Sequence, residues 1–251
     1  MRRDTNLWQR SMPRSEAAKS LNIALGLSQR RHLPVLKFMG GTYAVWSLPA
    51  LLRQRYRFHV SDEPGRLRFA RGGWTLALDE VYAKTLVMEW GKWERYYLPQ
   101  FPLRNKTVLL VGAGQGESAA FYASHGATRF ICVESDDYLE GSADVLRANM
   151  EGNHWDAVIY KERFALKHLS EMPFDFAEID CEGGERELLK LDKIGFPCVV
   201  EYHGADTGDE LVRKFGMERV DEKSVRVVNG REVGLLRATP GPGHDGRPPA
   251  Q

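Results

Sequence analysis

The stretch that decides the fold is residues 107–117, TVLLVGAGQGE, in which an apolar run leads directly into a glycine-rich loop. The run Thr107–Val111 predicts a buried strand. Gly112, Gly114 and Gly116 let the backbone turn tightly and let a ligand approach it without meeting a Cβ atom. A helix beginning after this loop would point its N-terminus at that ligand. The stretch therefore predicts the strand, loop and helix of a ligand-binding α/β unit.

Beyond this unit, short apolar runs alternate with helix candidates. The expected strands are Arg129–Val133, Ala157–Tyr160, Phe174–Ile179 and Cys198–Tyr202, and the expected helices begin near Gly116, Asp136, Phe164, Gly184 and Asp206. Such alternation is typical of a parallel sheet covered on both faces. Two β-type runs then flank Asn229-Gly230, a strong hairpin signal. The predicted fold class is α/β: a Rossmann-like, doubly wound, mainly parallel sheet with a terminal antiparallel hairpin.

The first hundred residues follow another pattern and predict an α+β extension. A segment from Ser15 has helical apolar periodicity, and the runs on either side of Pro64-Gly65 alternate as antiparallel strands do. We expect residues 1–100 to form this extension and residues 101–238 to form the cofactor-binding domain. The Pro- and Gly-rich residues 239–251 have little to bury and are expected to be disordered.

Charge is distributed unevenly along the 251 residues, although the net charge is only +1. The first 71 residues carry 14 Lys or Arg against 4 acids, whereas the remainder carries 21 against 30. This favours docking of the basic part on the acidic part over contact with nucleic acid or a membrane surface. The three cysteines form no CxxC pair and fit a reducing, cytoplasmic compartment. The longest early apolar stretch, residues 43–52, is too short to span a membrane.

Two acidic residues near the loop indicate the kind of cofactor. A dinucleotide loop has glycine or alanine where this sequence has Glu117. A carboxylate there would repel a pyrophosphate but suits S-adenosylmethionine, which is cationic and lacks phosphate. Glu134 ends the next strand, where a carboxylate accepts hydrogen bonds from ribose hydroxyls in dinucleotide folds. The alternative role of Glu134 is to cap the helix expected near Asp136.

The loop, the segment GATRFICVES at residues 126–135 and Asn149 resemble the class I S-adenosylmethionine-dependent methyltransferases. Residues 176–189, FAEIDCEGGERELL, and the later VVEYHG resemble the FkbM methyltransferase family, whose pattern is Asp-x-Glu-Gly-x-Glu and then Glu-x-His. The resemblance covers residues 107–204 and implies methyl transfer, commonly to an oxygen of a small molecule or sugar. It implies that the cofactor is bound by Gly112, Gly114, Gly116, Glu117 and Glu134, with Glu162, Arg163 and Phe164 near adenine.

Four further polar residues follow the fourth and fifth strands. Asp180 and Glu182 come after one strand, and Glu201 and His203 end the next. In parallel sheets ligands bind at the carboxyl edge, so we expect these side chains to converge beside the transferred methyl group. They could take a proton from a hydroxyl or hold a divalent cation. The simpler reading is a helix cap at Asp180 or Glu182, followed by acids that suit the first turn, Glu185 and Glu187.

The leading functional hypothesis is therefore an S-adenosylmethionine-dependent O-methyltransferase with a small-molecule or sugar acceptor. Three alternatives stay open. RNA methylation would use the basic N-terminal part, although no RNA-binding motif is recognisable there. An NAD(P)-dependent oxidoreductase would need a different loop. A non-catalytic binding module would need neither Glu134 nor Asp180. The sequence leaves the oligomeric state and any metal requirement undecided.

Overall fold

The computed structural model describes residues 35–38, 41–44, 59–63, 66–220, 225–228 and 230–239. The chain divides into two units, Met1–Lys92 and Trp93–Gln251. The helix predicted from Ser15 and the tail predicted to be disordered after Thr239 lie outside the described residues.

The first unit contains antiparallel strands and most of a long helix. Strands β1 (Val35–Phe38) and β2 (Gly41–Ala44) pair with each other, and β3 (His59–Glu63), β4 (Arg66–Arg71) and β5 (Trp74–Leu78) form a three-stranded sheet. Alternate residues of β4 and β5 are buried, which confirms the predicted antiparallel strands. The helix α3 (Glu80–Tyr96) was not predicted.

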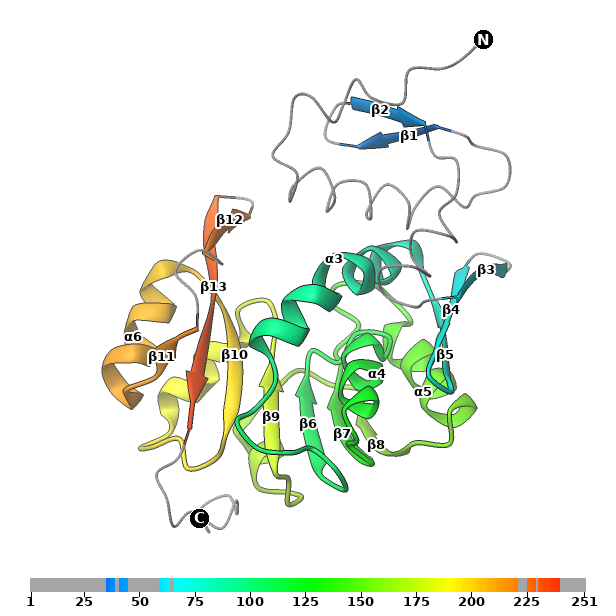
Figure 1. The fold of residues 1–251 in the computed structure, drawn as a ribbon. Coiled ribbons are helices and arrows are strands. Elements are labelled where there is room, and N and C mark those ends of the chain that lie inside the picture. The colour runs from blue at the N-terminus through cyan, green and yellow to red at the C-terminus, as the bar shows by residue number, and fades with distance from the viewer. Residues whose placement is uncertain are drawn as a thin grey trace. The chain divides into compact units, whose positions relative to one another are not determined.

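The second unit is built on one eight-stranded sheet (Figure 1). Along the sheet the order is β11-β13-β10-β9-β6-β7-β8, and β12 pairs with the outer part of β13. The strands are β6 (Thr107–Val111), β7 (Arg129–Val133), β8 (Asp156–Tyr160), β9 (Phe176–Ile179), β10 (Cys198–His203), β11 (Glu218–Arg219), β12 (Arg226–Val228) and β13 (Arg231–Ala238). The five strands from β8 to β10 are parallel, and β13 runs antiparallel to β10.

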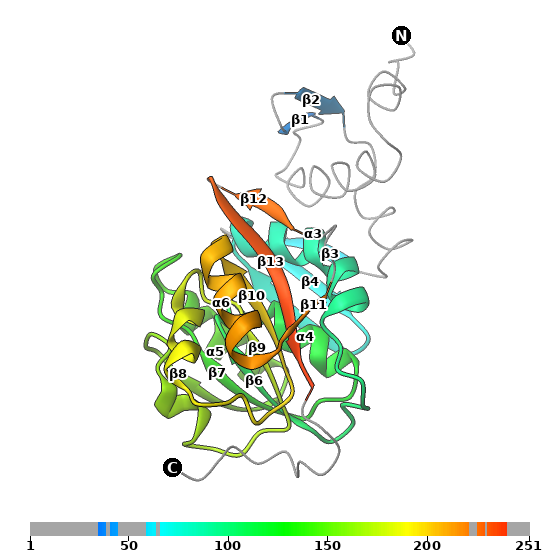
Figure 2. The same ribbon diagram turned by 90° about the vertical axis from the view of Figure 1, so that its left-hand side faces the viewer.

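This topology confirms the predicted fold class. The parallel strands follow the Rossmann order, and the hairpin around Gly230 inserts β13 between β10 and β11 instead of continuing the parallel sheet. Helices cover both faces: Figure 2 shows α6 (Ala205–Phe215) on one side of the sheet and α4 (Glu117–Ser124) on the other. The order places the tips of β6, β9 and β10 next to one another at one edge.

Three predicted helices differ from the observed ones. The helix expected near Asp136 is α5 (Ser142–Gly152), because the Asp136 carboxylate reaches forward and accepts a hydrogen bond from the Ala143 N–H at 2.7 Å. The helices expected near Phe164 and Gly184 are the short 3₁₀ segments η1 (Leu166–Leu169) and η2 (Gly184–Lys190).

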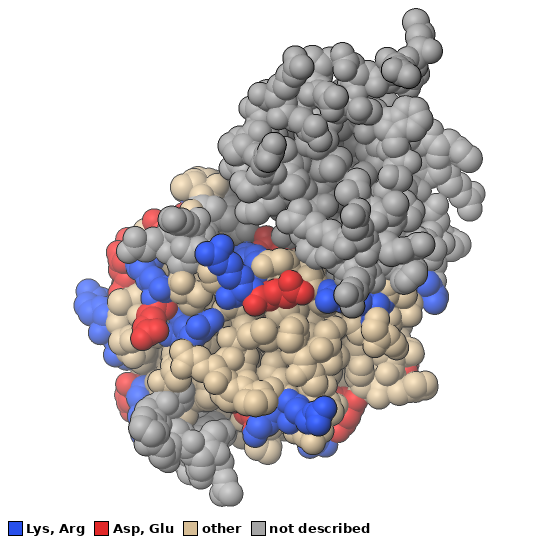
Figure 3. All heavy atoms as spheres, in the orientation of Figure 1, with Lys and Arg blue, Asp and Glu red and all other residues tan. Residues whose placement is uncertain are grey.

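The surface of the described part carries both signs of charge. On the face drawn in Figure 3, basic and acidic side chains lie among one another. Among the described residues, no helix is both long and apolar enough to cross a membrane.

Candidate functional site

The glycine loop between β6 and α4 is packed against the end of β9. Gly112 has φ +79°, and a Cβ atom built on it would lie 1.7 Å from the backbone oxygen of Asp180. The Asp180 N–H in turn donates to the Val111 carbonyl oxygen at 2.8 Å. Only glycine fits a position with this backbone angle and this contact. Gly112 therefore holds the glycine loop and the Asp180 segment together.

The N–H groups of the loop donate to carboxylates of the chain itself. The Gly114 N–H donates to Glu134 Oε2 at 2.7 Å, and the Gln115 N–H donates to Glu117 Oε2 at 3.0 Å. On the other side of the loop, the Asn149 side chain donates to the Gln115 carbonyl oxygen at 2.7 Å. The loop is thus fixed by the end of β7, by α4 and by α5, through two carboxyl groups and an amide.

Glu117 and Glu134 are both buried, and this changes the charge that the sequence suggested for Glu117. Glu117 is 4% exposed, and burial raises its pKa from 4.5 to about 8, with a further contribution from Glu134 and Glu178. At neutral pH it is mainly protonated, so it does not repel an anion as expected. Glu134 is also buried, and burial raises its pKa, although the Gly114 N–H acts in the opposite direction.

The segment expected near adenine follows β8, as predicted, and its charged side chains have partners. Arg163 Nε lies 2.8 Å from Asp137 Oδ2, and Glu162 Oε1 accepts from Lys167 and from His168. Phe164 stacks on the ring of His168. A role in adenine binding stays a prediction for Glu162, Arg163 and Phe164.

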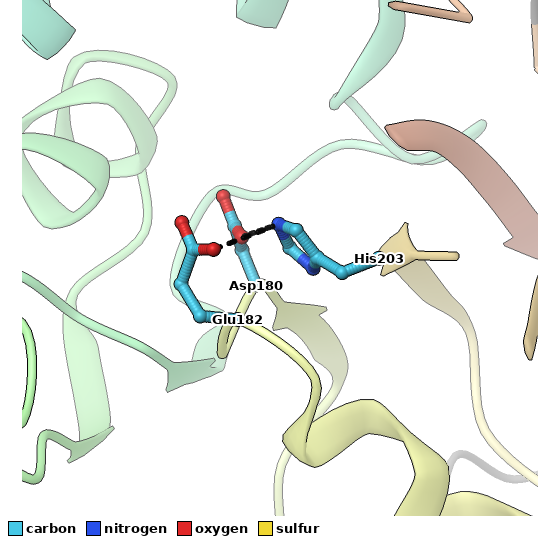
Figure 4. A group of neighbouring side chains, drawn as sticks. All are labelled: Asp180, Glu182 and His203. Atoms are coloured by element: carbon cyan, nitrogen blue, oxygen red, sulfur yellow. Dashed lines mark ion pairs between the residues drawn. The ribbon is translucent and has the colours of Figure 1, made fainter. Parts of the chain in front are cut away.

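The polar residues expected after β9 and β10 do converge. His203 Nε2 lies 3.4 Å from Glu182 Oε2, 3.8 Å from Asp180 Oδ1 and 3.9 Å from Glu201 Oε1. Figure 4 shows the Asp180 and Glu182 carboxylates and the His203 ring pointing toward one another from the two strand tips. Glu182 stands at φ +51°, a backbone angle uncommon outside glycine. We call Asp180, Glu182, Glu201 and His203 the acidic cluster.

The acidic cluster controls the charge of its histidine. Burial disfavours the imidazolium, but the carboxylates of Glu185, Asp180 and Glu182 outweigh it and raise the pKa of His203 to about 9. The His203 side chain is 7% exposed, whereas that of Glu182 is 67% exposed. The cluster is therefore open on the Glu182 side and closed behind the imidazole.

Two supporting residues were not recognised in the sequence. Glu185, assigned to the first turn of a helix, is fully buried, and its carboxylate accepts hydrogen bonds from the N–H groups of Gly183 and His203, each at 2.7 Å. It ties the loop after β9 to the end of β10. The Tyr97 hydroxyl donates to Glu201 Oε2 at 2.8 Å from 104 residues away. The Asp-x-Glu-Gly-x-Glu pattern contained a signal for Glu185, but no local pattern marked Tyr97.

No family model and no curated protein matches this sequence. Solved structures match at low identity. Fibrillarin of Aeropyrum pernix with bound S-adenosylmethionine is 13% identical, with a TM-score of 0.41, over 57% of this chain and 70% of its own. A Pyrococcus abyssi tRNA (uracil-54, C5)-methyltransferase with S-adenosylhomocysteine is 15% identical, with a TM-score of 0.46, over 70% and 44%.

A further match is a protein described as a transferase from Pyrococcus horikoshii. It is 12% identical, covers 93% of this chain and 96% of its own, and has a TM-score of 0.47. The fibrillarin structure contains S-adenosylmethionine and the tRNA methyltransferase structure contains S-adenosylhomocysteine, and both are similar to this chain only distantly.

Proposed function

We propose that this protein is an S-adenosylmethionine-dependent methyltransferase. The observation that carries the proposal is the use of the loop N–H groups. In a dinucleotide loop, backbone N–H groups and the helix N-terminus receive a pyrophosphate. Here the N–H groups of Gly114 and Gln115 already donate to Glu134 and Glu117. A pyrophosphate would have to displace the Glu134 carboxylate and the mainly protonated Glu117 from these N–H groups.

S-adenosylmethionine fits the same groups better. It carries an ammonium and a sulfonium, which are attracted to carboxylates, and it has no phosphate. Glu134 stands at the end of β7, where a carboxylate can accept hydrogen bonds from ribose hydroxyls. Its Oε1 accepts a long hydrogen bond, 3.4 Å, from the Asp136 N–H. The same observations argue against the NAD(P)-dependent alternative.

The acceptor chemistry follows from the acidic cluster. S-adenosylmethionine, when bound, supplies a methyl group on a sulfonium. As the acceptor oxygen forms the new C–O bond, the C–S bond breaks and the sulfur becomes a neutral thioether. The chain must position the hydroxyl and receive its proton. Asp180 and Glu182 are carboxylates at the edge of β9, next to the glycine loop, and are suited to both tasks. We therefore propose oxygen as the methylated atom.

The same cluster favours a small neutral acceptor, such as a sugar or another hydroxylated molecule. The three carboxylates of the acidic cluster, together with that of Glu185, surround one histidine, an arrangement that repels the phosphates of an RNA strand. The mixed charges seen in Figure 3 give no support to an RNA-binding face on that side of the described part. The finer resemblance to the FkbM family stays a proposal that fits this acceptor class.

Calorimetric titration tests the cofactor. We expect S-adenosylhomocysteine to bind with a Kd on the order of micromolar, and NAD and NADP not to bind. Glu134→Ala should weaken S-adenosylhomocysteine binding by about 1–3 kcal/mol, because the ribose hydroxyls lose their charged acceptor. Asp156→Asn is the matched control, since Asp156 pairs with Arg129 at the start of β7 and β8, away from the carboxyl edge of the sheet. Binding of NADP without binding of S-adenosylhomocysteine would end the methyltransferase proposal.

Transfer of a labelled methyl group tests the acceptor. Panels of sugars and other hydroxylated small molecules are compared with total RNA at equal protein concentration. Label on small molecules supports the proposed acceptor class, and label found only on RNA would overturn it.

A further inference from the structure

The imidazole of His203 lacks the hydrogen bonds that a buried polar ring normally has. Its side chain is 93% buried, since only 7% of it is exposed, and Nδ1 has no hydrogen-bond partner. Nε2 points into the gap between Asp180 and Glu182 (Figure 4). The unpartnered Nδ1 faces Glu185, so the ring nitrogen that an ion in this gap would contact is Nε2, for which the nearest side-chain oxygen is Glu182 Oε2 at 3.4 Å.

The distances in this gap suit an ion. Two donor atoms that share one cation at about 2.1 Å lie roughly 3–4 Å apart. Nε2 lies 3.4 Å from Glu182 Oε2 and 3.8 Å from Asp180 Oδ1. One donor atom from each of Asp180, Glu182 and His203 falls within 4.8 Å of the others. We propose that Asp180, Glu182 and His203 form a binding site for a divalent transition-metal cation.

The surroundings of the imidazole support this assignment. A metal-bound histidine usually directs its second ring nitrogen at a carboxylate or carbonyl, which fixes the ring. His203 Nδ1 lies 3.6 Å from Glu185 Oε1, and that carboxylate is itself held by two backbone N–H groups. Glu185 would thus act as a positioning residue for the ring. A cation bound at Nε2 would also offset the charges of the acidic cluster, which carries three carboxylates.

The donor set indicates the class of cation. Carboxylate oxygens suit Mg²⁺, Ca²⁺ and Mn²⁺, and an imidazole nitrogen shifts the preference toward transition metals. Glu182 is exposed, so an open side of the site remains for water or for an acceptor hydroxyl. In the proposed methyltransferase, on which this last point rests, the cation would lower the pKa of that hydroxyl. Cation binding itself does not depend on that function.

Mn²⁺ alone, added to the full chain, is the probe. Free Mn²⁺ gives a six-line electron paramagnetic resonance signal that is lost on binding, and an imidazole ligand adds ¹⁴N modulation to the spin echo. We expect one bound Mn²⁺ per chain with ¹⁴N modulation. Glu182→Gln should lower the affinity on the order of tenfold or more. It replaces an exposed side chain and keeps its shape, so the fold should not be affected.

Glu187→Gln is the matched control, because Glu187 lies in the same segment and pairs with Lys190 on the outside. Its Mn²⁺ affinity should stay within about twofold of wild type. A wild-type chain that leaves the free Mn²⁺ signal unchanged, or a Glu182→Gln variant that binds as tightly as wild type, would overturn the metal site. Titration with S-adenosylhomocysteine is separate, so failure of the cofactor proposal is distinguishable from failure of this one.

Discussion

Replacing Glu117 with Gln should change how the stability of this protein depends on pH. Glu117 has an unfolded-state pKa near 4.5, and burial raises it to about 8 in the folded chain. Between these values the folded state holds a proton that the unfolded state has released. The unfolded state therefore binds fewer protons, and the free energy of unfolding falls as pH rises through this window. At 1.36 kcal/mol per pH unit, the full window corresponds to roughly 5 kcal/mol as an upper limit.

Gln keeps the acceptor for the Gln115 N–H, which now donates to Glu117 Oε2, and does not titrate. Urea unfolding at pH 5, 7 and 9, followed by circular dichroism without cofactor, measures the effect. We expect Glu117→Gln to be similar to wild type near pH 5 and more stable by about 2–5 kcal/mol at pH 9. Glu187→Gln, in an exposed ion pair, should track wild type at each pH. An equal difference between Glu117→Gln and wild type at pH 5 and pH 9 would refute the reasoning.

Three further variants test other parts of the structure. Gly112→Ala should lower the free energy of unfolding by about 1–3 kcal/mol more than Gly141→Ala does. Both glycines have positive φ, but only Gly112 faces a backbone oxygen. Equal losses of unfolding free energy in urea would contradict this contact. Asp180→Asn should bind S-adenosylhomocysteine normally but transfer methyl on the order of 10² times more slowly, and a wild-type rate would remove it from the site. Tyr97→Phe should lower unfolding free energy by about 1–3 kcal/mol, since Glu201 loses a buried donor; an unchanged urea midpoint would argue against this bond.

The sequence by itself determined the sheet of the second unit. Thr107–Val111 and Arg129–Val133 have the predicted bounds in the structure, and the hairpin at Gly230 joins the sheet as expected. Strands buried on both faces are apolar along their whole length, so the ends of an apolar run in the sequence indicate the ends of the strand. The same pattern placed Gly112 and Asp180 at strand tips, because each comes directly after the end of an apolar run.

The helices were predicted less well, because their starts depend on contacts outside the helix. Asp136 lies six residues before the first residue of α5 and still accepts from its second N–H group. The segment from Gly184 contains the acids expected in a first helical turn, yet it is a 3₁₀ segment whose Glu185 binds β10. Local helix propensity carries no information on where a neighbouring strand lies, so it could not predict these contacts.

Only the tertiary structure decided the electrostatics of the site. Residue type placed Glu117 and Glu134 near the loop, but their protonation depends on burial, which is a property of the packed chain. The Tyr97–Glu201 bond joins residues 104 positions apart, and no sequence pattern could indicate it. The sequence shows which chemical groups are present at the sheet edge. The fold fixes which of them are paired, which are charged, and which meet across the gap between β9 and β10, because distance and dielectric exist only once the chain is packed.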